Sequence, residues 1–482
     1  MGLATACGGG GGGNSGPSPA LPALESISLS PANASGTVNV TQKFTAVGTY
    51  SDQSTANLST SVTWSSFNVQ VATISNDTGF QGLATPKASG ITRIKATADG
   101  FTGTALLTVG PVADNVLPIT INGELCWASD TYPNKPCVSV TVCTPGTEVC
   151  QTIKDILLDT GSYGLRIFKD ALTDVTLQQV AVSAGALAEC VQFGDGTALW
   201  GPVQTADVIL GNEPAIRSIP IQVIDATFGV RPDPDPCSDA YLSPADAQYT
   251  GILGVGLFKE DCGTACSSPP PPNHVWPYYA CNETGCSVTA VPLASQVPNP
   301  AAALPEDNNG VIVQFPSLPA GGTTSVNGLL VLGIGTRSNN TPSGVTAYSA
   351  DQFARFSTVF GGQTYSSYID SGSNGLFFSP PASSPIPTCG GLDWFCPSSK
   401  LNLIATNTGD GGSPSGEVAF QIDNFTDLMI GSSNKVFSEI GANFSARRSS
   451  FDWGLPFFFG RDVFVGFDER SSSLGDGPYW AY

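Results

Sequence analysis

Several residue types are scarce in this chain, and their scarcity excludes whole classes of protein. One histidine is present, His274, with no H-E-x-x-H, cysteine–histidine or G-x-S-x-G pattern, so zinc enzymes and serine–histidine hydrolases have no support. Basic residues number 19 against 39 acidic ones, a formal net charge of -20 that would repel nucleic acid. No apolar run reaches the length needed to cross a bilayer.

The abundant residues indicate an all-β protein. Gly, Ser, Thr and Val are common, and sustained helical periodicity is scarce, which is typical of many short strands joined by turns. A length of 482 residues favours two or three folding units with sizeable cores.

The chain contains 13 cysteines, none in a C-x-x-C spacing. This pattern favours structural disulfides, formed in an oxidising compartment, over a zinc or redox site. We therefore expect no metal ion, and no motif in the sequence indicates an organic cofactor. An odd number leaves one cysteine to be explained.

Cys7 is the cysteine that stands apart. The stretch Leu3–Cys7, followed by six glycines, resembles a bacterial lipoprotein processing site with a flexible tether. Ala4 replaces the usual large aliphatic residue, and the charged and hydrophobic parts of a signal peptide are missing upstream. A lipid on Cys7 would leave twelve cysteines, which can pair fully. The alternative is a disordered tail with one free thiol.

Composition divides the chain into three sections. Residues 1–22 form a Gly/Ser/Pro tether, and residues 23–110 carry the alternating pattern of a small β-sandwich. The stretch 62–109, which begins Val-Thr-Trp, resembles the group 2 bacterial immunoglobulin-like (Ig-like) domain. This resemblance implies a rigid spacer or, alternatively, an adhesion or glycan-binding module. The remaining section, 111–482, contains the chemistry.

Two segments of that section are versions of one pattern. The sequence is ILLDTGSYGLRIF at 156–168 and SYIDSGSNGLFF at 367–378. Aligning Asp159 with Asp370 (370 − 159 = 211) also pairs Thr160 with Ser371 and the flanking glycines, serines and leucines. A single Asp-Thr-Gly is a weak signal, because Asp-x-Gly often only caps a turn. Two matched copies indicate a site built from both.

The physical chemistry of this pattern points to paired acid–base catalysis. Two carboxylates about 3 Å apart cannot both ionise, so they share one proton and provide a base and an acid together. Glycines beside the acids would let the two backbones approach, and hydroxyls would hold the carboxylates. Glycosidase-like carboxylates, by contrast, lie roughly 5 Å apart or more. The expected supporting residues are Thr160, Gly161, Ser162, Ser371, Gly372 and Ser373.

These motifs resemble the pepsin family of aspartic peptidases. The resemblance implies an all-β, two-lobed, pepsin-like β-barrel domain, with lobe one at about 111–300 and lobe two at about 301–482. Asp159 and Asp370 would then be the catalytic pair. Tyr249–Gly254 resembles the segment that passes beneath the first aspartate, and Phe457–Phe464, with Gly460, resembles its partner. The pattern is also similar to that of a bacterial secreted family without an assigned function.

Two positions depart from the pepsin pattern. The hairpin that closes over substrate, the flap, is expected at Phe193, Gly194, Asp195 and Gly196, and Phe193 stands where the family usually has tyrosine. Arg166 stands where a tryptophan is usual. The flap change leaves open a rival function, a surface binding or adhesion protein that keeps the cleft without catalysis.

Together these features predict an aspartic-type peptidase of the bacterial cell envelope. Its partner is expected to be a peptide or protein substrate, and its contact with the membrane, at the outer membrane or extracellular face, only the lipid on Cys7. We expect a monomer that binds no nucleic acid. Cys389 and Cys396 are the cysteines that follow residue 300, and two separately folding lobes require them to pair with each other.

Overall fold

A computed structural model describes residues 22–482 except 112, 128–131, 270, 272–275 and 431. It divides into two compact units, one up to Gly110 and one from Pro111 to Tyr482, with 39–41 assigned to the second. Cys7 lies outside the described residues. None of the described helices is long and apolar enough to cross a membrane.

The first unit is a small Ig-like β-sandwich. Alternating residues of its strands point inward around Trp64 and Phe44, which are 2% and 0% exposed, so the period-two pattern forms the core. Its sheets are β1 (Leu24–Ser30), β4 (Thr45–Tyr50) and β5 (Thr55–Asn57); β2 (Asn33–Thr37), β10 (Phe101–Gly110), β9 (Gly90–Ala98) and β6 (Thr63–Ser66); and β3 (Gln42–Lys43), β8 (Leu83–Pro86) and β7 (Ala72–Ile74).

The second unit is also built from strands, and its first half contains a closed barrel. The barrel closes through pairings of β12 with β18, β13 with β20 and β14 with β19. The strands of this first half, barrel and flanking strands together, are β11 (Val116–Ile121), β12 (Pro136–Cys143), β13 (Cys150–Asp159), β14 (Tyr163–Phe168), β15 (Gln178–Gln179), β16 (Ala181–Val182), β17 (Gly185–Gln192), β18 (Ala198–Ile209), β19 (Ile216–Ile224), β20 (Gly251–Val255), β21 (Tyr278–Asn282) and β22 (Gly285–Val288).

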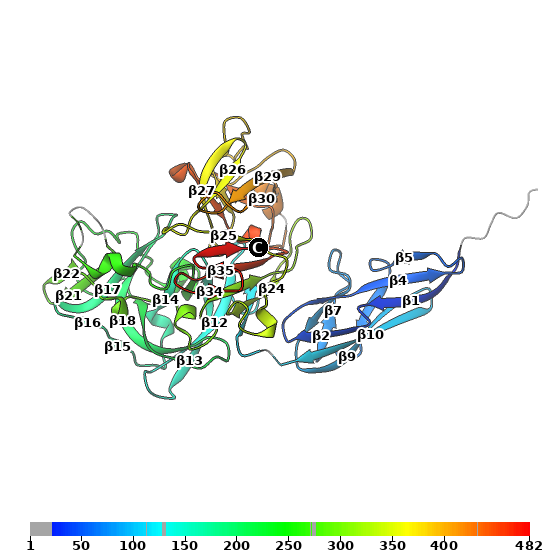
Figure 1. The fold of residues 1–482 in the computed structure, drawn as a ribbon, viewed down its shortest axis with the longest axis horizontal. Helices are drawn as coiled ribbons and strands as arrows, with labels where there is room; N and C mark the ends of the chain where they lie inside the picture. The colour runs from blue at the N-terminus through cyan, green and yellow to red at the C-terminus, as the bar shows by residue number, and fades with distance from the viewer. Residues whose placement is uncertain (1–21, 112, 128–131, 270, 272–275, 431) are drawn as a thin grey trace, which may run out of the picture. The chain divides into compact units, whose positions relative to one another are not determined.

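The second half forms a separate seven-stranded sheet. In Figure 1 its strands, yellow to orange, gather away from the cyan-to-green strands of the first half. They are β26 (Phe356–Phe360), β27 (Gln363–Ile369), β28 (Leu376–Phe378), β29 (Leu401–Thr408), β30 (Ser415–Ile422), β31 (Gly441–Ala442) and β32 (Ser450–Trp453).

A third group of strands joins the two halves. β11 pairs with β24, and β24, β23, β33, β36 and β25 then follow side by side. The bounds are β23 (Gly310–Gln314), β24 (Val326–Leu332), β25 (Ala347–Ser349), β33 (Asp462–Gly466) and β36 (Tyr479–Ala481), with a hairpin of β34 (Ser471–Ser472) and β35 (Gly475–Asp476) beside them. One hydrophobic core runs through both halves.

Helices are short and lie in the connections. Among the described residues two are α-helices, α1 (Pro244–Ala247), whose first turn is capped by a Ser side chain, and α2 (Phe425–Met429), whose first turn is capped by an Asn side chain. The 3₁₀ turns are η1 (Lys169–Ala171), η2 (Gly263–Ser267), η3 (Leu293–Ser295), η4 (Ala301–Ala303), η5 (Ser338–Asn340), η6 (Ser445–Arg447) and η7 (Leu455–Phe458).

The two halves repeat one arrangement of strands. In the first half, β20 lies parallel to β13 and antiparallel to β14, with Gly254 opposite Asp159. In the second half, β32 lies parallel to β27 and antiparallel to β28, with Trp453 opposite Ile369. The residue that corresponds to Gly254 is therefore Gly454, which directly follows Trp453.

This register corrects the sequence prediction for the second half. Phe457 and Phe458 lie in η7, Phe464 lies in β33, and a Cβ at Gly460 would contact Ser317 rather than the aspartates. Gly454, in contrast, lies so close to the second motif that a Cβ there would fall 2.6 Å from the carbonyl oxygen of Ser373. The sequence Phe-Phe-Phe-Gly before and at Gly460 resembles the apolar residues before Gly254. Strand pairing, however, shows that Gly454 is the glycine that lies beside the second aspartate turn.

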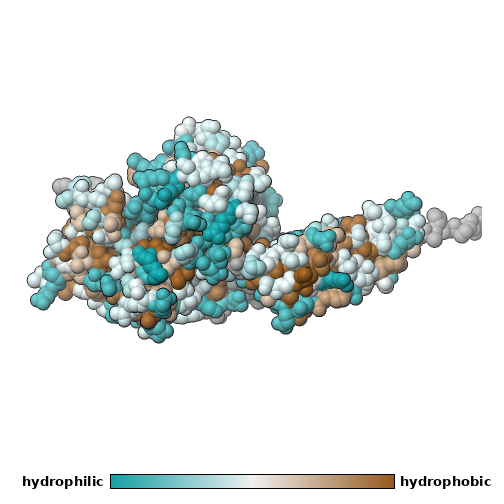
Figure 2. Space-filling model, turned by 60° about the horizontal axis from the view of Figure 1, so that its bottom comes forward, coloured by the Kyte–Doolittle hydropathy of each residue, from teal (hydrophilic) through white to brown (hydrophobic). Residues whose placement is uncertain are grey.

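In the part of the chain that the structure describes, six disulfides link twelve cysteines. Cys389 pairs with Cys396, and the other ten pair among themselves within residues 126–286, as the two-lobe partition predicted. Five of these disulfides close separations of 4 to 11 residues and link local hairpins or turns, whereas Cys190–Cys237 joins β17 to the loop after β19 over a separation of 47 residues. On the face shown in Figure 2, hydrophobic and hydrophilic residues alternate over short distances.

Candidate active site

The two aspartate turns are locked together by reciprocal hydrogen bonds. The N–H of Thr160 donates to Ser371 Oγ at 3.1 Å, and the N–H of Ser371 donates to Thr160 Oγ1 at 2.9 Å. Each hydroxyl also donates to the carbonyl oxygen of the residue before the opposite aspartate, at 2.9 and 2.8 Å. Both side chains are buried, so these four bonds fix the two turns side by side.

The glycines of the motifs allow the carboxylates to approach. A Cβ on Gly161 would lie 2.6 Å from Cγ of Asp370, and one on Gly372 would lie 2.9 Å from Cγ of Asp159. Neither position can therefore accept any other residue without moving the opposite acid. Each carboxyl group thus lies directly against the glycine of the opposite motif.

Donors within each motif hold the carboxylates in place. Asp159 accepts from the N–H of Gly161 at 2.8 Å and from the Ser162 hydroxyl. Asp370 accepts from the N–H of Gly372 at 2.8 Å and from Ser373 Oγ at 2.9 Å. The structure thus brings together the two acids and all six supporting residues named from the sequence.

Asp370 holds the proton of the pair more tightly than an isolated carboxyl group would. Burial raises its pKa well above the ordinary value, and the charge of Asp159 raises the pKa further. The arrangement therefore favours one proton shared between the two acids, with a base and an acid side by side.

The flap is the hairpin formed by β17 and β18. At its tip the N–H of Phe193 donates to the carbonyl of Thr197, and Gly194, Asp195 and Gly196 are exposed. A Cβ on Gly194 would lie 3.8 Å from the guanidinium carbon of Arg447, in the second half. The tip of the hairpin therefore reaches across from the first half to the second.

The side chain of Phe193, at the start of this tip, packs against a group of aromatic residues. It lies against a buried cluster that contains Tyr249, with Tyr132 and Tyr241 at its edge. Because Phe193 has no hydroxyl, any phenol near the aspartates must come from elsewhere. Burial raises the pKa of Tyr132 above its ordinary range, and the charges of Asp370 and Asp159 raise it further. Tyr132, which packs against the same cluster as the flap residue Phe193, is thus a candidate site residue that the motifs did not reveal.

The loop that presents Tyr132 is anchored to both halves of the domain. The side-chain N–H groups of Asn134 donate to the backbone carbonyls of Asn374 and Phe437, both at 2.9 Å. Its side-chain oxygen Oδ1 accepts from the N–H of Phe437 at 2.8 Å. Asn374 belongs to the turn that carries Asp370. The loop before β12 is therefore fixed directly against the second aspartate turn.

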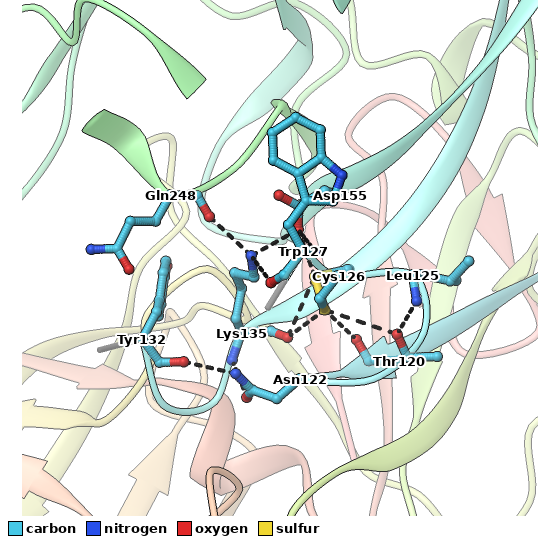
Figure 3. Close-up of a disulfide and its surroundings, with 10 residues drawn as sticks. Thr120, Asn122, Leu125, Cys126, Trp127, Tyr132, Lys135, Asp155 and Gln248 are labelled. Atoms are coloured by element: carbon cyan, nitrogen blue, oxygen red, sulfur yellow. Dashed lines mark hydrogen bonds and ion pairs between the residues drawn. A yellow bond between two sulfur atoms is a disulfide. The ribbon is translucent and has the colours of Figure 1, made fainter. Parts of the chain in front are cut away.

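A buried ion pair of the next residue, Lys135, ties this loop to the first half (Figure 3). Lys135 Nζ lies 2.7 Å from Asp155 Oδ1 and donates to the carbonyl of Gln248 at 2.9 Å, and both charged side chains are at most 1% exposed. The disulfide Cys126–Cys137 lies against Asp155. Cys126, Cys137 and Asp155 are close enough to hold a metal ion, but their sulfurs are joined to each other and offer no thiolate ligand.

Arg166, at the position expected to hold tryptophan, is a buried charge. Its Nη2 lies 2.7 Å from Glu189 on the flap strand β17 and 3.2 Å from Asp261. Its Nη1 donates to the carbonyl of Tyr163. Arg166 therefore links the strand after the first motif to the base of the flap.

A second residue missed from the sequence is Asp452. It lies on β32, two residues before Gly454, and its carboxyl group is 2.7 Å from the hydroxyl of Ser373. Asp452 lies beside the site because β32 pairs with β27, the strand that leads to Asp370. The sequence pattern predicts that pairing for the segment around Gly460 instead.

Comparisons with known proteins identify families for both units. A family model described as protein of unknown function (DUF3443) matches residues 111–482, and the bacterial Ig-like domain (group 2) matches residues 23–109. The Ig-like prediction is confirmed. The description of the larger family names no peptidase, so the pepsin-like function remains a hypothesis.

Similar individual proteins cover only parts of the chain. Ice-binding protein 1 of Shewanella frigidimarina (strain NCIMB 400) is 43% identical over 98 residues, 20% of this chain and 10% of that protein. The chain thus matches about a tenth of that relative's length. Domains 5–6 and 4–9 of the S-layer protein SbsC match at 15% identity and a TM-score of 0.17. They cover 43% and 44% of this chain, and 100% and 33% of their own.

Proposed function

The chain belongs, over residues 111–482, to the family of proteins of unknown function DUF3443, and we propose that this domain is an aspartic-type peptidase. The observation that carries the proposal is the reciprocal bonding of Thr160 and Ser371, which fixes the turns of Asp159 and Asp370 side by side, each acid against the glycine of the opposite motif. Two turns that only capped their own strands would have no need of this lock.

The proposed reaction uses one proton held by the pair. The Asp159 carboxylate removes a proton from a water molecule, whose oxygen attacks the peptide carbonyl carbon, while Asp370 donates its proton to the carbonyl oxygen. The resulting diol collapses as the C–N bond breaks, and one of its hydroxyl groups returns a proton to Asp370. A proton from the pair goes to the leaving nitrogen, and the products are an acid and an amine.

The flap and Tyr132 supply positioning around this chemistry. A hairpin tip over the acids would exclude water and hold an extended peptide in the cleft. Tyr132 would provide a phenol that Phe193 cannot. The partly exposed rings of Phe193 and Phe377 would favour peptides with apolar residues around the cut, whereas Leu165 and Leu376 are buried in the core.

We further propose that the protein works at the bacterial cell surface or outside the cell. Six disulfides indicate an oxidising compartment, and the group 2 Ig-like domain would serve as a spacer. A lipid on Cys7, which lies outside the described residues, would tether it to the envelope.

Cleavage of a mixed peptide library tests the function. We compare the wild type with Asp159→Asn, Asp370→Asn and, as a matched control, Asp410→Asn, whose side chain is exposed in a turn. The wild type and control should cut the same peptides, and each dyad variant should lose at least about 10²-fold in rate, because each removes half of one proton-sharing unit.

A different outcome would favour the rival function. If the wild type cuts nothing that the dyad variants leave intact, yet retains peptides or glycans in a binding assay, the domain is a binding protein that keeps the cleft. Phe193 in the flap is the feature that favours this alternative.

A further inference from the structure

A third carboxyl group lies next to the aspartate pair. Asp452 is 3% exposed, and its Oδ2 is 2.7 Å from Ser373 Oγ, which is in turn 2.9 Å from Oδ2 of Asp370. Strand β32 holds Asp452 between Tyr368 of β27 and Phe377 of β28. The chain Asp452–Ser373–Asp370 is therefore set by the sheet and not by a loop.

The hydroxyl of Ser373 has one proton but faces two carboxyl oxygens. It can donate to only one of them, so a second hydrogen bond requires a proton on a carboxyl group. The Oδ1 of Asp370 already accepts from the N–H groups of Gly372 and Ser373. Both contacts are satisfied when a protonated Asp452 donates to Ser373 and Ser373 donates to Asp370. The reverse order, in which Asp370 donates its proton to Ser373, would remove that proton from the aspartate pair.

The surroundings of Asp452 disfavour its ionised form. Its Oδ1 is buried and has no hydrogen-bond partner among the described residues, which would be costly for a carboxylate. Burial is the largest cause that raises its pKa, and the charge of Asp159 raises it further. The Ser373 hydrogen bond and Arg447 of η6 lower it. The other titratable groups that face it are Asp370 and Tyr368.

The first half has no counterpart of this residue. In the matching register, the residue two before Gly254 is Ile252, which is apolar and buried. Ser162 therefore serves Asp159 alone, whereas Ser373 is shared between Asp370 and Asp452. The asymmetry acts on Asp370, the acid with the raised pKa.

We propose that Asp452 is a protonated positioning residue whose hydrogen bond to Ser373 orients Asp370. Its catalytic consequence rests on the peptidase function proposed above, but its protonation state does not. The three carboxyl groups then hold two protons and one negative charge. Asp370 keeps a fixed donor on Oδ2 while its own proton is used in the reaction.

Two variants separate this role from simple packing. In Asp452→Asn the amide N–H can still donate to Ser373 but cannot ionise, whereas Asp452→Leu has a similar size and no donor. Asp452→Leu should lower kcat/KM for peptides by about 3- to 10-fold, since a hydrogen bond between neutral groups is lost. Asp452→Asn should restore most of that loss. Equal losses in both variants would overturn the positioning role.

Infrared difference spectra at neutral pH test the protonation without any catalysis. The wild type minus Asp452→Asn should show the absorption band of a protonated carboxyl group, and the band of an ionised carboxylate in its place would overturn the proposal. If the wild type cleaves no peptide but the protonated band is present, the peptidase function fails and the protonated Asp452 stands.

Discussion

At the scale of single residues, the site depends on hydroxyl and carboxyl groups whose partners are fixed by short turns. Thr160 and Ser371 lock the two turns, while Ser162 serves Asp159 and Ser373 lies between Asp370 and Asp452. The difference between the halves comes from what lies behind these serines, apolar Ile252 in the first half and Asp452 in the second.

Removing the phenol of Tyr132 should weaken catalysis without unfolding the protein. Tyr132→Phe keeps the ring that packs beside Phe193 but loses a hydroxyl close to the aspartates. We expect kcat/KM to fall by about 3- to 10-fold, the value of one neutral hydrogen bond. Steady-state cleavage measures it, with Tyr50→Phe in the Ig-like domain as control. An unchanged rate would remove Tyr132 from the site.

The sequence predicted the dyad because both of its halves have a local signature. Each aspartate ends a strand and is followed by a glycine and a hydroxyl residue, and one such pattern repeated 211 positions later (370 − 159) is readable without a structure. Tyr132 and Asp452 have no such signature. Their places depend on a loop anchored through Asn134 and on strand register.

At the scale of elements, strand register explains the one misplaced landmark. Gly460 shares its local pattern with Gly254, but β32 and not β33 pairs with the strand of the second aspartate. The intervals from acid to glycine are then 254 − 159 = 95 and 454 − 370 = 84. A pattern of a few apolar residues before glycine cannot distinguish two such strands.

The link between β14 and the flap should be a large contributor to stability. Arg166→Met would leave Glu189 and Asp261 buried without a cation, and we expect the free energy of unfolding to fall by about 3–5 kcal/mol at neutral pH. Lys169→Met, which removes an exposed partner of Asp225, should cost at most about 1 kcal/mol. Urea unfolding measures both.

The loss in Arg166→Met should depend on pH. Burial, followed by the nearby Glu189, raises the pKa of Asp261 well above its ordinary value. A raised folded-state pKa means that stability is greatest in acid and falls as the pH rises through that value. The variant should therefore recover part of its stability in acid. A loss that is constant with pH would contradict a buried, uncompensated charge.

At the scale of the whole molecule, the chemistry and the Ig-like domain lie in separate compact units. All site residues, Tyr132 and Asp452 included, belong to residues 111–482. We expect that segment, produced alone, to fold and to cleave the same peptides with unchanged kcat/KM. Loss of activity in a folded 111–482 protein would show that the Ig-like domain takes part in catalysis and is more than a spacer.

The pH dependence of kcat/KM for peptide cleavage tests the central claim most directly, because it counts the proton that Asp159 and Asp370 share. The rate should fall in strong acid, where a doubly protonated pair has no base, and again as the pH rises, where a doubly ionised pair has no acid. The raised pKa of Asp370 places the second fall above the usual carboxyl range of about 4. A rate that climbs steadily past neutral pH, or cleavage that survives in both Asn variants, would contradict the account.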